Sequence, residues 1–241
     1  ETTSLSTGNV SMHAVRRTEW AHATIDAYKP LFESLTEALT RKKEDGAFGD
    51  DPMQAMFGQM MQFLGPMMLS MTAGSMVGHL AQRSFGQFDL PIPRVSEEGI
   101  QIITNNIADF GKEWSLPMEE LLLWVCLQQL CLHTVLRIRH VEENVTSLLF
   151  DYVSGFESNP SGLEEKLQGI DMNSPSALED LQRSLGSPEV ILGAIQSQGQ
   201  LNLLPEINAV IAVIVGYVDY IMDSIGSGLI GSYGQITEAM R

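Results

Sequence analysis

Two runs of seven consecutive apolar residues constrain the fold of this 241-residue chain more than any other feature. The first run spans residues 121–127 and follows Pro117, and the second spans residues 209–215 and follows Pro205. Because proline is well accepted in the first turn of a helix, each proline is predicted to open a helix. A helix without a polar face is expected to be surrounded by protein. These two helices are therefore predicted to form the core, packed against each other or against a common sheet.

The longest apolar stretch is too short to predict a membrane-spanning helix. It covers residues 209–218, about ten residues between Asn208 and Asp219, whereas a span needs about 20. No basic segment with a following cleavage site is found at the start, so no signal peptide is expected. Cys126 and Cys131 are predicted to diverge on one helix as free, buried thiols, which is consistent with a cytoplasmic location.

The charge balance excludes two classes of partner. The chain has 14 Lys and Arg against 30 Asp and Glu, a formal net charge of −16, which repels nucleic acid and anionic membranes. With 44% hydrophobic and 18% charged residues, the chain is not expected to be disordered. We predict one domain over residues 1–241, with a helical part to about residue 95 and a core from about residue 96. The oligomeric state is left open.

The remaining sequence predicts a mainly α fold with a small β contribution (α+β). Residues 100–104 alternate and are rich in β-branched side chains, so they are the best candidate for a strand. Two prolines two residues apart exclude a helix from residues 86–93. A loose Gly/Ser loop is predicted over residues 226–234. Other helices are predicted over residues 11–43 (bent at Pro30), 53–85 and 107–114, and in short pieces between residues 154 and 200.

Five segments spread over nearly the whole chain share their order and spacing with one family. They are the helix around Trp20 and residues 77–91, 105–110, 123–127 and 216–219. Together they resemble a bacterial family of zincin-like proteins that are described as hydrolases or zinc-dependent metalloproteases. The resemblance implies a zincin-like fold for this chain.

The same resemblance locates a metal site that this chain lacks. In the family an H-E-x-x-H motif supplies two zinc ligands and a general base from one helical face. Its first histidine, its glutamate and its second histidine correspond to Gln128, Gln129 and Leu132. The glutamate that relatives use as third ligand corresponds to Val215. Only the aspartate four residues later, which supports the site in relatives, is retained as Asp219.

These replacements predict a catalytically degenerate member that works by binding another protein. A carboxamide is a poor zinc ligand, and leucine and valine have no donor atoms. Gln129 cannot act as a general base near neutral pH. No cofactor is therefore expected, although relatives hold zinc. One alternative is a metallohydrolase with a relocated site at His133, His140 and Asp219, and another is a small-molecule binder that uses the former cleft.

Overall fold

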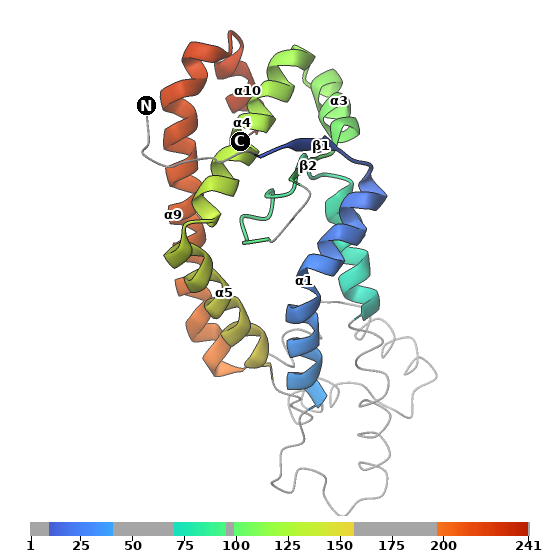
Figure 1. Ribbon diagram of the computed structural model, residues 1–241, viewed down its shortest axis with the longest axis vertical. Coiled ribbons are helices and arrows are strands. Elements are labelled where there is room, and N and C mark those ends of the chain that lie inside the picture. The colour runs from blue at the N-terminus through green and yellow to red at the C-terminus, as the bar shows by residue number, and fades with distance from the viewer. Residues whose placement is uncertain (1–9, 41–69, 95–98, 157–196, 241) are drawn as a thin grey trace, which may run out of the picture. The chain divides into compact units, whose positions relative to one another are not determined.

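The computed structural model describes residues 10–40, 70–94, 99–156 and 197–240 (Figure 1). This part of the chain is mostly helical with one two-stranded parallel sheet, which confirms the predicted fold class. A helical segment covers residues 70–81. The other elements are β1 (Met12–Ala14), α1 (Arg17–Thr40), β2 (Ile100–Ile102), α3 (Thr104–Glu113), α4 (Met118–Leu136), α5 (Arg139–Ser154), α9 (Gln198–Leu229) and α10 (Tyr233–Met240).

The chain divides into two compact units. The first unit contains residues 1–29, 75–149 and 206–241, and the second contains residues 30–74 and 150–205. The sheet, α4 and the apolar half of α9 all belong to the first unit, so the candidate site is built there. The single domain expected from the sequence stays a prediction. The short helices predicted over residues 163–195 lie outside the described residues.

The sheet confirms one predicted strand and corrects one predicted helix. The best strand candidate forms β2, where Ile100 and Ile102 are both buried. Its partner β1 pairs with it in parallel, Met12 opposite Ile100 and Ala14 opposite Ile102. The prediction of a helix from residue 11 is wrong, because α1 begins at Arg17. Two of the three β1 residues are exposed, so the sequence of β1 shows no alternation of buried and exposed positions. Only its pairing with β2 identifies it as a strand.

Helix α4 forms much of the core of the first unit. It begins directly after Pro117, as predicted, and Val125 is fully buried. Leu123 is 42% exposed, so the expectation that protein surrounds the whole helix is wrong. Cys126 and Cys131 are free thiols at half-buried positions, and burial raises the pKa of both. The buried core residues from α4 and α9 are Leu121, Trp124, Val125, Leu132, Val135, Leu136, Ile214, Val218 and Met222.

Helix α9 differs from its prediction in both its start and its burial. It begins at Gln198, so Pro205 lies inside the helix instead of opening it. Within its most apolar window of 18 residues only 11% are buried, so the expected enclosure by protein is wrong. In the described part of the chain α9 is long and apolar enough to cross a bilayer, contrary to the length expected from the sequence, and α4 with α5 passes the same test only as a bent pair. Mostly buried core helices of soluble proteins also pass this test. An apolar run does not determine how many neighbours will cover it.

The predicted loop over residues 226–234 is replaced by the junction of two helices. Helix α9 continues to Leu229 and α10 begins at Tyr233. A Cβ atom on Gly226 would collide with the ring of Tyr233, whose hydroxyl donates a 2.7 Å hydrogen bond to Asp223. Glycine at this position therefore allows close packing of α10 on α9. From the local sequence, a glycine needed for such packing looks the same as a glycine in a flexible loop.

Candidate functional site

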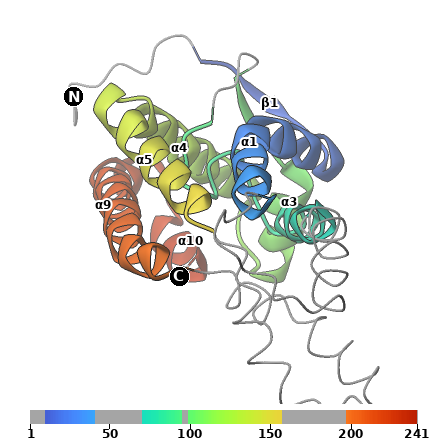
Figure 2. The same ribbon diagram turned by 90° about the horizontal axis from the view of Figure 1, so that it is seen from below.

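Helix α4 places the three motif positions in different surroundings. Gln128 is half-buried, Gln129 is fully buried and Leu132 is 5% exposed. Leu132 lies in one buried cluster with Ile214 and Val218 of α9. The two apolar helices therefore pack against each other, as predicted, and Figures 1 and 2 both show α9 beside α4.

Gln129 attaches the turn at residues 85–89 to α4. Its Oε1 atom accepts the backbone N–H of Phe88 at 2.7 Å, and its Nε2 atom donates to Oδ1 of Asp89 at 2.7 Å. The side chain fits closely, since a Cβ atom on Gly86 would lie 2.5 Å from Cδ of Gln129. Both polar ends of the buried carboxamide are thus in use, as buried polar groups require.

A second contact holds the same turn from the other side. Trp20 of α1 is 1% exposed, and its Nε1–H donates to the carbonyl oxygen of Gly86 at 2.9 Å. The turn therefore lies between a buried tryptophan of α1 and a buried glutamine of α4. Two segments of the family resemblance, the helix around Trp20 and residues 77–91, are in direct contact here.

Asp89 is the ionisable group next to Gln129, and the sequence analysis did not single it out. Its carboxylate accepts the backbone N–H of Phe85 at 2.5 Å and that of Gly86 at 3.1 Å. Burial raises the pKa of Asp89 to about 6, although these two hydrogen bonds and the one from Gln129 each act to lower it. A pKa of about 6 leaves the carboxyl group mostly ionised at neutral pH, and the residue as a whole keeps exposed surface. The signal that could have found it is its place within residues 77–91, one of the five segments of the family resemblance.

His133 is a packing residue. Its ring is 9% exposed and packs on Phe88, with the ring centroids 5.6 Å apart. Burial and the nearby charge of Arg137 lower the pKa of His133, so the imidazole is neutral. Its Nδ1 atom is buried and has no hydrogen-bond partner among the residues described.

The structure does not gather the residues of the relocated site. His133 is buried, whereas His140 and Asp219 are exposed on α5 and α9. Over residues 10–40, 70–94, 99–156 and 197–240, no three His, Cys, Asp or Glu side chains are grouped so that they could hold a metal ion. The proposed trio therefore gains no support from the structure.

The residues that the resemblance places at zinc positions do not fit zinc. Both polar ends of Gln129 are bonded within the protein, and Leu132 is part of the apolar core. Val215 follows the buried Ile214, but its side chain is 37% exposed and has no donor atom. Zinc requires imidazole, thiolate or carboxylate ligands. These residues therefore supply no zinc-dependent step.

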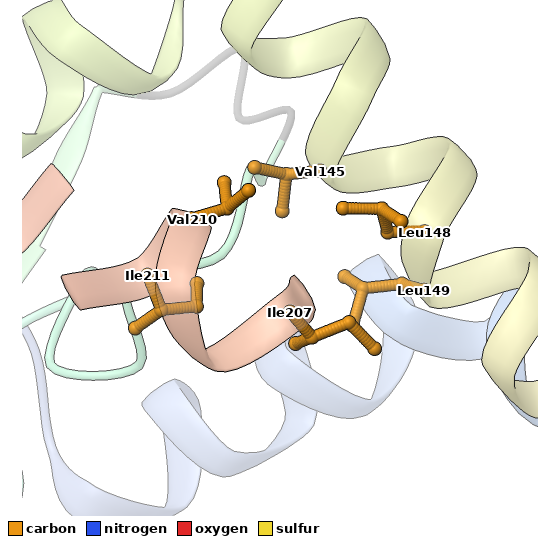
Figure 3. A pocket seen from close by; sticks show the side chains of 6 residues that line it. All are labelled: Val145, Leu148, Leu149, Ile207, Val210 and Ile211. Carbon is orange, nitrogen blue, oxygen red and sulfur yellow. The ribbon is translucent and has the colours of Figure 1, made fainter. Parts of the chain in front are cut away.

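A small apolar groove between α5 and α9 offers no polar contact to a ligand. It is lined entirely by aliphatic side chains, three from each helix, and Figure 3 shows them facing one another. Its volume of about 10 Å³ is close to that needed for one water molecule, which would find no hydrogen-bond partner there. The lining residues are Val145, Leu148, Leu149, Ile207, Val210 and Ile211.

A comparison with family models agrees with the resemblance found in the sequence. The sequence model of the zincin-like metallopeptidase family matches residues 1–241. Among solved structures, a protein of Chloroflexus aurantiacus described as a "putative hydrolase with a novel fold" matches with 19% identity and a TM-score of 0.48. The match covers 95% of this chain and 55% of that one, so this chain spans about half its length. No curated protein matches the chain.

Proposed function

From the premise that this chain belongs to the zincin-like metallopeptidase family, we propose that it is a member without zinc-dependent hydrolysis that works by binding another protein. The observation that carries the proposal is the bonding of Gln129. A glutamate there would act as general base, a contribution of roughly 10²–10⁴ in rate. The carboxamide instead holds Phe88 and Asp89, so the position supports the fold.

Restoring the family's residues tests the loss of the zinc site. The quadruple variant Gln128→His, Gln129→Glu, Leu132→His and Val215→Glu is expected to bind one zinc ion, and the unchanged protein none, as measured by elemental analysis after dialysis. A chelator is expected to lower the melting temperature of the loaded variant by several degrees, because a bound metal adds to folding free energy. The melting temperature of the unchanged protein should not move.

The matched control for this experiment keeps Val215 and changes only the three α4 positions. This triple variant lacks one ligand and should bind zinc more weakly than the quadruple variant. Stoichiometric zinc in the unchanged protein would contradict the proposed loss. Failure of the folded quadruple variant to bind zinc would show instead that the residues were matched to the wrong family positions.

The partner surface that we propose is the outer face of α9, formed by Ala209, Ala212, Val213, Gly216 and Tyr220. Val213 is 71% exposed and Tyr220 is 65% exposed. A Cβ atom on Gly216 would meet nothing within 4 Å. Exposed apolar surface of this kind typically marks a place where another molecule binds.

The charges around the outer face of α9 favour one kind of partner. Helix α9 contains no lysine or arginine, and its acidic residues Glu206, Asp219 and Asp223 lie on either side of the uncharged residues 207–218. We therefore assign to this face an apolar helix of another protein with basic residues at both ends, since opposite charges favour the right encounter. A second copy would bring acidic ends together. The net charge of −16 opposes the surface of an anionic membrane as the occupant.

A pair of synthetic helical peptides tests this assignment. A peptide with an Ala/Leu stripe and lysines at both ends is expected to bind at least about tenfold more tightly than the same peptide with terminal glutamates, and salt should weaken it. Val213→Asn should weaken binding of the lysine peptide without changing the melting temperature, and Thr146→Asn on the exposed side of α5 should change neither. Equal binding of the two peptides would contradict the assignment, and self-association of the unchanged protein in sedimentation would assign the face to a second copy.

A further inference from the structure

A small cavity lies at the corner between α4 and α5. The two helices meet at an angle of 84°, and Arg137 caps the carboxyl end of α4. The cavity has a volume of about 40 Å³, which is room for about three waters. Three apolar and three charged side chains line it: Phe88, Pro93, Leu136, Arg94, Arg137 and Glu142.

Arg94 is a half-buried cation whose hydrogen-bond partners among the described residues are all neutral. Its Nη1 atom donates to Oγ1 of Thr24 at 3.0 Å and its Nη2 atom donates to Oε1 of Gln101 at 3.1 Å. Burial lowers the pKa of Arg94, and the nearby Tyr28 opposes this only in part. A guanidinium has five N–H donors, so three are without a partner among the residues described. A half-buried guanidinium without a hydrogen-bonded carboxylate among the described residues is only partly compensated, and Glu142 faces two arginines in the cavity. An anion in the cavity would reduce the remaining cost.

The charges of the lining select a singly charged ligand. Arg94 and Arg137 carry two positive charges and Glu142 carries one negative charge, so the lining has a net charge of about +1 at neutral pH. A carboxylate matches both this charge and the planar donor fork of a guanidinium. Glu142 would repel the second charge of a phosphate. The side chains of Phe88 and Leu136 offer apolar surface to a short alkyl group.

We propose that this cavity binds a short-chain monocarboxylate, with its carboxylate between Arg94 and Arg137 and its alkyl group on Phe88 and Leu136. The inference depends neither on the loss of zinc chemistry nor on the outer face of α9, because the charges that carry it are those of Arg94, Arg137 and Glu142, which belong to neither. It assigns to Arg137 a role in ligand binding beyond capping α4.

Propionate is the probe for the test, titrated into the full chain at constant ionic strength and followed by its own NMR signals. Saturable binding in the millimolar range is expected, together with a rise in melting temperature through linkage. Arg137→Gln should weaken binding at least about tenfold, as loss of a charge-assisted contact implies. Glu142→Gln should strengthen binding several-fold, because a repulsive charge is removed. Arg137 is exposed, so its replacement should leave the fold intact, whereas Arg94 also ties Thr24 to Gln101.

Arg139→Gln is the matched control. Arg139 lies two residues further along, pairs with Glu143 at 2.9 Å and does not line the cavity. Its replacement should leave propionate binding unchanged. Absence of saturable binding up to about 100 mM, well above the millimolar range expected for one paired carboxylate, would overturn the proposal. So would equal effects of Arg137→Gln and Arg139→Gln. Tighter binding of inorganic phosphate than of propionate would overturn the choice of a monocarboxylate.

Discussion

Replacing Gln129 by leucine is expected to lower the free energy of unfolding by about 2 kcal/mol, because a buried polar group left without its partner costs roughly 1–3 kcal/mol. Leucine has a similar volume, so no large cavity is created. The loss comes instead from the buried N–H of Phe88, which Gln129 holds at 2.7 Å. The carboxylate of Asp89 also loses a 2.7 Å contact, but it keeps its two backbone partners. Denaturant unfolding measures the effect, with an unchanged m-value as the sign that both end states are preserved.

Gln128→Leu is the matched control, one residue earlier on the same helix. Gln128 is half-buried, and its replacement should change the free energy of unfolding by no more than about 0.5 kcal/mol. Equal losses in the two variants would show that position 129 has no special structural role. The proposal that a fold-supporting amide has taken the place of a catalytic glutamate would then lose its main support.

Replacing Asn106 by alanine is expected to lower the free energy of unfolding by about 3–4 kcal/mol, since two buried carbonyls and one guanidinium lose a partner. Asn106 is 4% exposed. Its amide donates to the carbonyl oxygens of Ala81 at 2.9 Å and Ser84 at 2.6 Å, and its Oδ1 atom accepts Nε–H of Arg17 at 2.5 Å. One side chain thus ties α3 to α1 and to the end of the helical segment at residues 70–81.

The neighbouring asparagine provides the comparison for this prediction. Asn105 is exposed at the start of the same helix, so Asn105→Ala should change the free energy of unfolding by no more than about 0.5 kcal/mol. Thermal or denaturant unfolding of both variants and of the unchanged protein measures the loss of stability at each position. An Asn106→Ala protein as stable as Asn105→Ala would mean that the three hydrogen bonds contribute little.

Local patterns were sufficient for several elements of the fold. The start of α4 after Pro117, the strand at Ile100–Ile102 and the absence of a helix over residues 86–93 all follow from backbone preferences of nearby residues. The family could also be identified, because the order of five segments along the chain is itself sequence information. Such features need no knowledge of distant neighbours.

The surroundings of each side chain could not be obtained in this way. The apolar runs predicted that protein would enclose both helices, yet α9 buries one face in the core and leaves the other face exposed. The burial of a helix face depends on which distant segments pack against it. The strand β1 exists through its pairing with β2, about 90 residues away in the chain. The partners of Gln129, 40 and 41 residues away, and the lining that joins Arg94 to Arg137 likewise arise from contacts across the fold. Composition and periodicity describe the chain near each residue, whereas hydrogen bonds and charges act between residues that folding brings together.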